Sequence, residues 1–560
     1  MAVLLLVFAQ TLAELYLPTL MADIVDIGIV GSDTNYIMKI GALMLLITAG
    51  GTICSIVANF LSARTAVGFG SELRSKVFSK VESFSLHEFD KLGTATLITR
   101  NTNDITQVQM VTVIILRMMV QAPLMCVGGI IMALTKDKTL TLALIIVLPI
   151  IAGIITVIAR KGIPLFKLMQ LKIDKLNLVV REALTGIRVI RAFDRTEREE
   201  LRFDKANSDL TDNAIKVNKI MAVLMPIMML VMNFTIIAII WFGGIRIDNG
   251  HMQVGSLMAF IQYAMQIMFS IIMVSMMFVM IPRASASAVR INEVLDTVPE
   301  IIDPERPVES DGRRGFVEFR DVTFKYPGAE QPVLSDISFS VRPGEVTAII
   351  GGTGSGKSTL INLIPRFYDI EQGSILIDGV DIREMTQASL RAKIGLVPQK
   401  TVLFSGTVKE NIGYGRVAPT YEEVRCAADT AQATEFILTM EEGFNSVIAQ
   451  GGTNISGGQK QRLSIARALI RRPEIYIFDD SFSALDFKTD ARLRAALKRE
   501  IADATVFIIA QRVATVMDAD RIVVLDAGQI AGMGTHQELM NSSGVYREIV
   551  YSQLSEEELA

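Results

Sequence analysis

The hydrophobic and polar residues of this chain divide it into two parts of different character. About the first 283 residues carry long uncharged apolar runs, whereas the remainder alternates short apolar runs with polar ones. Six of the long runs approach or exceed the roughly 20 residues that a helix needs to cross a bilayer. They are Val3–Ala22, Ile37–Leu61, Ile114–Leu134, Leu140–Ile158, Met221–Ile245 and Val254–Ile281. Six such helices buried in one soluble domain would be exceptional, so the pattern predicts six membrane spans.

The basic residues between the spans predict the orientation. The links after the second and fourth spans are long and basic, running from Arg64 to Arg100 and from Arg160 to Lys219. Because Lys and Arg concentrate on the cytoplasmic side, both links and the C-terminal part are predicted to be cytoplasmic in a multi-pass plasma-membrane protein. The chain begins almost directly with apolar sequence, without the basic region or cleavage site of a signal peptide. This leaves a truncated or misassigned start open.

The two long links are too long to be loops without structure. In the second link, apolar residues return at spacings of mostly three or four, which is the period of a helix. These residues are Leu165, Leu168, Ile173, Leu176, Val179, Val180, Leu184 and Ile187. We predict that spans two to five continue as helices far into the cytoplasm and turn near His87–Leu97 and near Phe193–Arg198. The alternative is an inserted soluble domain, although neither link has clusters of strand or turn residues.

Composition and charge narrow the function classes. Half of the 560 residues are hydrophobic, and the net charge of −4 gives no indication of nucleic acid as a partner. The three cysteines, Cys54, Cys126 and Cys426, are too few and too scattered for a disulfide framework or a zinc site. We therefore expect a protein that faces a reducing cytoplasm.

A glycine-rich segment in the second part predicts a nucleotide site. Residues Gly351–Ser358 fit the P-loop pattern G-x-x-x-x-G-K-[ST], directly after the apolar strand Val346–Ile350 and before the helix-like run Leu360–Ile364. The glycines let backbone N–H groups close around phosphate oxygens, and the helix N-terminus adds its partial positive charge. Lys357 would reach the β- and γ-phosphates of ATP, and Ser358 would hold Mg²⁺. The predicted ATP-binding residues are Gly351, Thr353, Gly354, Ser355, Gly356, Lys357, Ser358 and Thr359.

Two further segments complete this prediction. The apolar strand Ile475–Asp479 ends in an acid, and we expect it to lie beside the P-loop strand and deliver Asp479 to the Mg²⁺ shell. Ser456-Gly457-Gly458-Gln459 opens a helix that runs to Leu469, which is a second phosphate-binding device. One nucleotide does not need two such devices. Two copies of the domain packed head to tail would let each P-loop face the Ser-Gly-Gly of the other copy.

Together these elements resemble an ABC transporter half-molecule of the exporter class, over nearly the whole chain. The matching segments are the six spans with their extensions, the P-loop, Val397–Gln399, the signature Ser456–Gln459, Phe478–Asp480 and the D-loop Ser483–Asp486. The resemblance implies that Tyr326 stacks on adenine and that Gln399 senses Mg²⁺ and the attacking water. It also implies that Ser456, Gly457, Gly458, Gln459 and Asp486 act at a nucleotide site, and that the two turns are coupling helices.

The resemblance and the composition predict a fold class and the residue boundaries of its domains. We expect a membrane α-helical bundle with cytoplasmic coupling loops over residues 1–300, then a P-loop α/β domain of the ABC nucleotide-binding type over residues 315–555. The stretch Asp303–Arg314, with prolines and clustered charge, makes residues 301–314 a linker.

Two catalytic positions depart from the family pattern. Asp480 stands where a glutamate usually polarises the attacking water, and its carboxylate would sit about 1.5 Å further back. A misplacement near 1 Å can cost roughly a hundredfold in rate. Gln511 stands in place of the switch histidine, and glutamine cannot carry charge or relay a proton. The three histidines, His87, His251 and His536, offer no nearby substitute.

A chain that combines an intact signature with an impaired catalytic site is similar to the degenerate-site subunit of bacterial heterodimeric multidrug ABC exporters. That resemblance implies a second half-transporter with catalytic glutamate and histidine, a hydrophobic or amphipathic small-molecule substrate and contact with membrane lipid. Three alternatives stay open. The first is that the two changes are tolerated drift that slows hydrolysis without abolishing it. The second is that the chain is a homodimeric slow transporter or regulator. The third is that it is an importer built on the exporter fold.

Some residues within the spans could contact a substrate. Glu14, Arg117 and Gln121 are polar within apolar runs, and buried ionisable residues in membranes often face a cavity. Arg117 lies near the cytoplasmic end of the third span, so an alternative is that its side chain extends to the membrane–water interface. Methionines are dense in spans five and six, which suits an adaptable cavity but also packing or lipid contact. They include Met221, Met225, Met228, Met232, Met265, Met268 and Met276.

Overall fold

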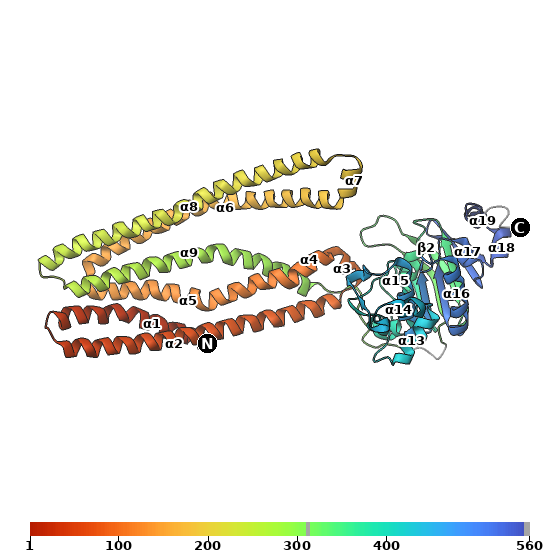
Figure 1. The fold of residues 1–560 in the computed structure, drawn as a ribbon, viewed down its shortest axis with the longest axis horizontal. Helices are drawn as coiled ribbons and strands as arrows, with labels where there is room; N and C mark the ends of the chain where they lie inside the picture. The colour runs from red at the N-terminus through yellow and green to blue at the C-terminus, as the bar shows by residue number, and fades with distance from the viewer. Residues whose placement is uncertain (310–313, 554–560) are drawn as a thin grey trace. The chain divides into compact units, whose positions relative to one another are not determined.

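The computed structural model describes residues 1–309 and 314–553, apart from the side chains of residues 143, 276, 278 and 279. The side chain of Met276 and part of the predicted linker 301–314 therefore lie outside the described residues. The chain forms two compact units (Figure 1). The membrane unit contains Met1–Val81 and Ala95–Asp296, and the nucleotide unit contains Glu82–Thr94 and Thr297–Ala560.

The described residues of the membrane unit form helices joined by short turns. Six of its helical segments are long and apolar enough to span a membrane, and each contains one predicted span. The helices are α1 (Ala2–Asp23), α2 (Thr34–Glu82), α4 (Thr94–Thr99), α5 (Ile105–Lys136), α6 (Lys138–Thr185), α7 (Ile187–Ala192), α8 (Thr196–Asp248) and α9 (Val254–Asp296), with π-helical segments η1 (Ile24–Ile29) and η2 (Arg100–Asp104). The predicted six-span bundle is confirmed.

The long links are continuations of these helices. Helices α2, α6 and α8 have 49, 48 and 53 residues, about twice what a bilayer crossing requires. In the described parts of both links we find helices and turns but no strand, so the alternative of an inserted soluble domain is wrong. The first link breaks at Gly93, whose φ of 74° suits glycine. The second breaks at Gly186, before the short helix α7.

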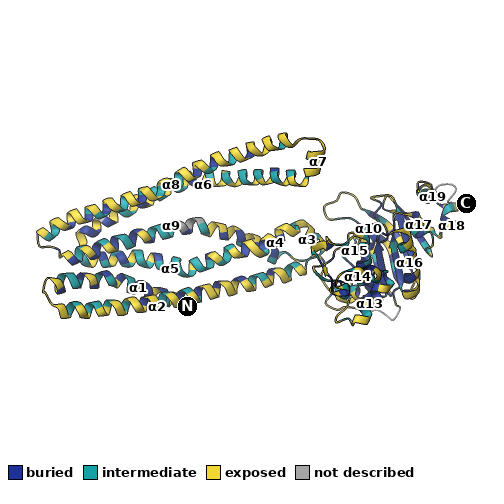
Figure 2. Cartoon of the chain, in the orientation of Figure 1, coloured by how far each residue is buried: buried dark blue, intermediate teal, exposed yellow. Residues whose placement is uncertain are grey.

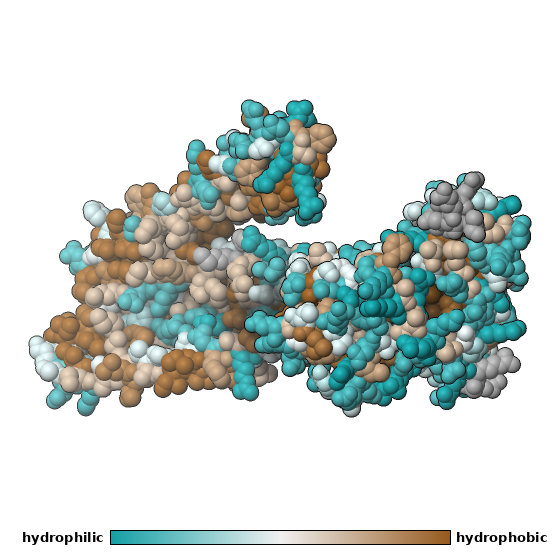
Figure 3. Space-filling model, turned by 45° about the vertical axis from the view of Figure 1, so that its right-hand side comes forward, coloured by the Kyte–Doolittle hydropathy of each residue, from teal (hydrophilic) through white to brown (hydrophobic). Residues whose placement is uncertain are grey.

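The spans keep apolar side chains on their outer surfaces. Helices α6 and α8 form one hairpin, while α1, α2, α5 and α9 run side by side (Figure 1). Much of each span is exposed (Figure 2), and the exposed surface is largely hydrophobic (Figure 3). Leu45, Ile53 and Trp241 are examples of large exposed residues. Such a surface is suited to contact with lipid or another subunit, because exposing so much apolar area to water is unfavourable.

The nucleotide unit is built around a six-stranded sheet of order β12-β11-β3-β10-β9-β6, in which only β12 is antiparallel. An antiparallel sheet of order β2-β1-β4-β5 and a small β7-β8 pair complete the strands. The bounds are β1 (Val317–Phe324), β2 (Leu334–Val341), β3 (Val346–Gly351), β4 (Gln372–Ile377), β5 (Val380–Asp381), β6 (Ile394–Val397), β7 (Gly406–Thr407), β8 (Val447–Ile448), β9 (Ile475–Asp479), β10 (Thr505–Ile509), β11 (Arg521–Asp526) and β12 (Gln529–Gly534).

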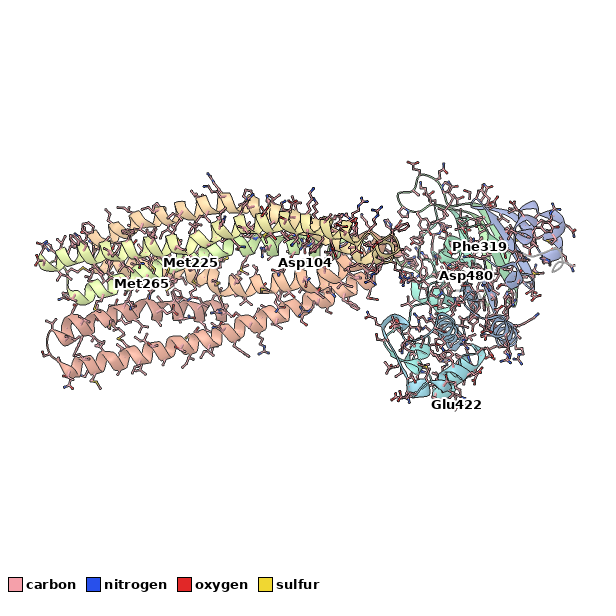
Figure 4. All side chains as sticks on the ribbon, turned by 45° about the horizontal axis from the view of Figure 1, so that its top comes forward. Asp104, Met225, Met265, Phe319, Glu422 and Asp480 are labelled. Atoms are coloured by element: carbon pink, nitrogen blue, oxygen red, sulfur yellow. The ribbon has the colours of Figure 1, made fainter. Side chains whose placement is uncertain are left out.

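The nucleotide unit also contains α-helices. They are α3 (Leu86–Leu92), α10 (Lys357–Leu363), α11 (Gln387–Ala392), α12 (Val408–Gly413), α13 (Tyr421–Thr430), α14 (Thr434–Thr439), α15 (Gly457–Arg471), α16 (Phe487–Glu500), α17 (Val513–Val516), α18 (His536–Ser542) and α19 (Gly544–Tyr551). The core lies between the two sheets, where Phe319 stacks on Phe339 at 4.7 Å between ring centroids (Figure 4). A second core fills the space between β9 and the helices α13 and α15.

The sheet order corrects one expectation. Strand β9 does not lie beside the P-loop strand β3, because β10 lies between them and pairs with both. Every residue of β9 is buried, as expected for a strand covered on both faces of a parallel sheet. The insertion of β10 has a consequence for function. Ile509 is paired with Asp479 on one side and Ile349 on the other, so the residues after Ile509 leave the sheet between the P-loop and Asp479.

Candidate nucleotide-binding site

The P-loop connects β3 to α10 through a backbone that only glycine adopts easily. Gly354 and Gly356 have φ values of 85° and 96°, in the left-handed region. A Cβ atom on Gly356 would lie 2.7 Å from Leu334 Cδ2, and one on Gly351 would lie 2.1 Å from the Leu525 carbonyl oxygen. Residues Gly352–Gly354 are exposed, so the concave side of the loop is open to a ligand.

Lys357 holds its ammonium group over this loop. Its Nζ donates to the carbonyl oxygens of Gly351 and Gly352 at 2.9 and 2.7 Å. Burial lowers the pKa of Lys357, although the nearby charges of Asp479 and Asp480 raise it in part. Ser355 Oγ is buried, and the described residues provide no hydrogen-bond partner for it. A half-buried cation and an unsatisfied hydroxyl in this loop fit a phosphate group.

Ser358 and Asp479 provide oxygen atoms suited to Mg²⁺. Ser358 Oγ donates to Asp479 Oδ1 at 3.3 Å, across the gap between α10 and β9. Burial raises the pKa of Asp479, and the hydrogen bond from Ser358 opposes this. Mg²⁺ prefers oxygen ligands and commonly takes one or two from protein and the rest from water and phosphate. These two residues would hold the ion, which would neutralise phosphate charge during hydrolysis.

The two departures from the family pattern meet at one atom. Asp480 Oδ2 accepts hydrogen bonds from Gln399 Nε2 and from Gln511 Nε2, both at 3.4 Å. Burial raises the pKa of Asp480, while hydrogen bonds from Gln399 and Ser483 lower it. The predicted residues Gln399, Asp480 and Gln511 therefore lie together, and the carboxylate has only amide donors at Oδ2 among the described residues.

The backbone at Asp480 forms a tight local turn at the end of β9. Its φ of 47° lies in the left-handed region, which Asp tolerates better than most residues. Its N–H donates to the Ile509 carbonyl oxygen at 2.9 Å, which joins the ends of β9 and β10. The expected setback of the carboxylate was argued for an unchanged backbone, so this local turn also determines where the Asp480 side chain points.

Tyr326 lies next to the P-loop helix. Its hydroxyl is 3.0 Å from Thr359 Oγ1, and its ring meets those of Phe324 and Tyr368 edge to face. The ring is half-buried and contacts the core between the sheets. This position is near enough to the phosphate loop for a base-stacking role, which remains a prediction.

The signature segment forms the N-terminus of α15. The Ser456 N–H donates to Gln459 Oε1 at 2.9 Å, and the Gln459 N–H donates to Ser456 Oγ at 3.3 Å. Ser456 and Gly457 are exposed, while a Cβ atom on Gly458 would lie 3.0 Å from the Ala484 carbonyl oxygen. Within the described chain no hydrogen bond joins this segment to the P-loop, so the two devices are separate.

Asp486 and one residue missed in the sequence belong to the same region. Asp486 caps α16, where its carboxylate accepts from the Thr489 N–H at 2.9 Å. The missed residue is Gln461, whose Nε2 donates to the Asp480 carbonyl oxygen at 3.5 Å and whose Oε1 accepts from the Ala484 N–H at 3.3 Å. Gln461 thus joins the signature helix to the residues after β9. The sequence signal that could have identified Gln461 is a polar glutamine on the apolar, buried face of α15.

Replacement of Lys357 by alanine is expected to weaken ATP binding on the order of 10- to 100-fold, because hydrogen bonds between charged groups contribute most to phosphate recognition. Titration of the purified full-length chain with a fluorescent ATP analogue measures this. Lys498→Ala is the matched control, since Lys498 is exposed on α16. Equal affinity of Lys357→Ala and Lys498→Ala would contradict the assignment.

Comparisons with known proteins agree with this geometry. The model of the ABC transporter transmembrane region matches residues 1–271, and the ABC transporter model matches residues 334–483. An uncharacterized ABC transporter ATP-binding protein of Mycobacterium tuberculosis is 46% identical over 97% of this chain and 94% of its own length. An ATP-dependent lipid A-core flippase of Syntrophus aciditrophicus is 33% identical over 93% and 86%. The structure of a bacterial Atm1-family ABC exporter with ATP bound gives a TM-score of 0.83 at 28% identity, covering 99% and 98%.

Fused membrane and nucleotide-binding parts of this kind define a half-transporter of the exporter class. The chain belongs to the ABC transporter family. It is a multi-pass membrane protein with a cytoplasmic nucleotide-binding domain, and it is an ATP-hydrolysing exporter that acts in a dimer.

Proposed function

We propose that this chain is one half of a heterodimeric plasma-membrane exporter. It binds ATP with Mg²⁺ at a degenerate site formed by residues Tyr326, Gly351–Thr359, Gln399 and Asp479. It also provides its own Ser456–Gln459 signature to the catalytic site of a different half-transporter. The proposed domain limits are 1–300 for the membrane part, 301–314 for the linker and 315–555 for the nucleotide domain.

The observation that carries the proposal is the group around Asp480. Gln399 and Gln511 donate to the same carboxylate oxygen. Neither amide can accept a proton from water or become charged near neutral pH. A general base works best when its pKa lies near the working pH and a partner orients it. Among the described side chains, both hydrogen bonds to Asp480 Oδ2 come from amides and neither from a titratable group, which favours slow hydrolysis.

The residues that would bind the nucleotide are, in contrast, well placed for binding. The P-loop glycines, the Lys357 ammonium and the Ser358–Asp479 pair have the geometry that a bound Mg²⁺-nucleotide needs. The signature is also intact, with Ser456 and Gly457 exposed at a helix N-terminus where backbone N–H groups attract phosphate. Good binding combined with poor chemistry is the property of a subunit whose partner carries out hydrolysis.

The proposed cargo is a hydrophobic or amphipathic compound. The spans carry methionines on two helices, with Met225 on α8 and Met265 on α9 (Figure 4). Met228 and Met268 are buried in one cluster, whereas Met225 is exposed. Flexible thioethers adapt to different apolar shapes. The name of one relative, a lipid A-core flippase, refers to an amphipathic lipid and supports the same class of cargo.

Comparison of the purified chain alone with the chain co-purified with a second half-transporter tests the proposal. We expect the chain alone to bind ATP but to hydrolyse it on the order of 100-fold more slowly than the pair, because the acid–base step lacks its usual groups. Release of inorganic phosphate gives both rates. Fast hydrolysis by the chain alone, abolished by Lys357→Ala, would contradict the degenerate-site assignment and favour tolerated drift.

Two other outcomes would replace the proposal. A chain that transports slowly as a homodimer, with no activation by any second half-transporter, would be a slow transporter or regulator. ATP-dependent efflux from inside-out vesicles would identify an importer, whereas uptake into them would identify an exporter.

A further inference from the structure

Helices α1, α5 and α9 bring a group of polar side chains together inside the membrane unit. Glu14 Oε1 accepts from Gln10 Nε2 at 2.8 Å, and Glu14 Oε2 accepts from Gln121 Nε2 at 3.5 Å. Gln266 Nε2 donates to the Glu14 backbone carbonyl oxygen at 3.3 Å. We call Gln10, Glu14, Gln121 and Gln266 the Glu14 cluster. Its members come from three helices and are up to 256 residues apart, from Gln10 to Gln266.

Glu14 differs from the other acids of the membrane unit that lie in contacts between helices. Asp104 is bound by Arg290 at 2.5 Å, and Asp137 is bound by Arg246 at 2.6 Å. Asp26 accepts from the backbone N–H groups of Gly255 and Ser256 at the start of α9, where the helix N-terminus supplies a partial positive charge. No Lys, Arg or His among the described residues forms an ion pair with Glu14. Its carboxylate therefore has amide donors but no compensating charge.

The cluster lies at a depth that falls within the hydrocarbon core of the membrane. At 1.5 Å per residue, Glu14, Gln121 and Gln266 are each about 18–23 Å along their helices from the outer ends of η1, α5 and α9. The hydrocarbon core is roughly 30 Å thick. A carboxylate at that depth is costly and generally marks a pathway or a binding site.

Apolar side chains flank the cluster on both sides. Toward the cytoplasm, Val3, Val7 and Ala58 are buried with Leu116 and Val120 packed against them. Toward the outside, Leu15 and Tyr263 belong to the core shared by α1, α5 and α9. A ligand at Glu14 would thus meet one negative charge within an apolar surface.

The outward side of the cluster is closed by tight packing. A Cβ atom on Gly128 would lie 2.4 Å from Leu15 Cδ1, so α1 and α5 approach closely there. The Tyr263 hydroxyl donates to the Leu15 carbonyl oxygen at 3.0 Å and lies 2.7 Å from Thr19 Oγ1. In this conformation these contacts block the route outward from Glu14.

One acceptor in the cluster is unused. Gln266 Oε1 is buried, and no described residue donates to it. An unsatisfied buried acceptor beside an uncompensated carboxylate suits a ligand that carries positive charge and, where present, N–H donors. Mg²⁺ and Ca²⁺ take six or more oxygen ligands, whereas one carboxylate with apolar flanks fits an organic cation.

We propose that the Glu14 cluster recognises the charged group of lipophilic organic cations, which are the substrate class of this exporter. The inference rests on the proposed export function and adds to it the charge of the cargo. Glu14 supplies the counter-charge, Gln10 and Gln121 hold its carboxylate in place, and the apolar side chains on both sides contact the body of the ligand.

Binding of two nearly isosteric ions of opposite charge tests this. The full-length chain, co-purified with its partner in nanodiscs, is titrated with tetraphenylphosphonium and with tetraphenylborate, after subtraction of empty nanodiscs. Glu14→Gln is expected to weaken tetraphenylphosphonium binding on the order of 10- to 100-fold, because a charge-assisted contact in a poorly solvated site is lost. Binding of tetraphenylborate should stay unchanged or become tighter.

The variants separate recognition from structure. Glutamine at position 14 keeps the size of the side chain and one acceptor oxygen for Gln10 or Gln121, so a purely structural role predicts equal changes in the binding of the two ions. Glu200→Gln is the matched control, since Glu200 is exposed on α8. Adding Gln121→Glu to Glu14→Gln returns a carboxylate to the same contact and should restore much of the tetraphenylphosphonium affinity.

ATP-dependent uptake of neutral N-phenyl-1-naphthylamine into inside-out vesicles is measured in parallel. If uptake occurs but Glu14→Gln binds tetraphenylphosphonium like the wild type, the Glu14 inference is overturned while the export function stands. If tetraphenylphosphonium binding depends on Glu14 but no probe is transported, the site is supported and the proposed export function is contradicted. Equal weakening of both ions by Glu14→Gln would also overturn the inference, because it would indicate a structural role.

Discussion

Combining Asp480→Glu with Gln511→His is expected to raise the ATPase rate of the purified chain on the order of 100-fold, since misplacement of a catalytic group by about 1 Å and loss of an acid–base group each cost roughly that much. In the wild type, Gln399 and Gln511 both donate to Asp480 Oδ2. Histidine at position 511 would replace one amide by a group that titrates near neutral pH, and glutamate at position 480 would lengthen the side chain by one methylene.

The gain has a structural cost that the measurement can detect. Asp480 has a φ of 47°, which glutamate tolerates less well than aspartate. We therefore expect a small loss of thermal stability together with the gain in rate. Phosphate release and thermal unfolding of the same preparations give both values.

Two controls make this result specific. Asp503→Glu with Gln529→His makes the same chemical changes at exposed positions and should leave the rate unchanged. Adding Lys357→Ala to the double variant should abolish the gain, because the nucleotide would no longer be held. A double variant that binds ATP normally but shows no increase in rate would contradict the view that these two residues limit hydrolysis.

The second large effect concerns the pair of half-transporters. Ser456→Arg in this chain is expected to lower the ATPase rate of the assembled pair on the order of 100-fold, the loss typical when a preorganised donor of a phosphate or oxyanion site is removed. Asp480→Asn should lower it by less than about 3-fold, since little acid–base chemistry is assigned to that site. The reason is that, in the proposed pair, Ser456 would face the partner's nucleotide, whereas Asp480 would face the slow site.

The Ser456 result needs a control for folding. Ser456 and Gln459 cap α15 through reciprocal hydrogen bonds, so its replacement also weakens the helix end. Ser542→Arg, on the exposed face of α18, introduces the same side chain without touching α15. ATP binding to the P-loop of the Ser456→Arg chain should remain. If Asp480→Asn proved more damaging than Ser456→Arg, the division of roles between the two sites would be reversed.

Several functional groups were predictable because they are local in sequence. The P-loop, the signature and the strand ending in Asp479 are short segments whose chemistry depends on neighbouring residues. The six spans were predictable for a related reason, since a bilayer crossing imposes a minimum apolar length on each helix. The helical continuation of the long links was also confirmed, because the 3.6-residue period persists beyond each span.

The position of Gln511 required the sheet order. From sequence, β9 was expected beside β3, and only strand pairing showed that β10 lies between them. Pairing between parallel strands joins residues distant in sequence, and hydrophobic pattern alone does not order buried strands. That order explains why Gln511 and Asp480 share a hydrogen bond. Gln461 was missed for the same reason, because its partners come from the segment that follows β9.

By itself, the sequence determined the number of spans, their orientation and the identity of the phosphate-binding segments, since each depends on composition or spacing within a few turns of chain. Only the tertiary structure decided which side chains meet across helices and strands. Glu14 and Gln121 were two isolated polar residues in the sequence, and the packing of α1, α5 and α9 joins them with Gln266 into one cluster. Contacts of this kind depend on helix register and close approach at glycines such as Gly128, which no local pattern specifies.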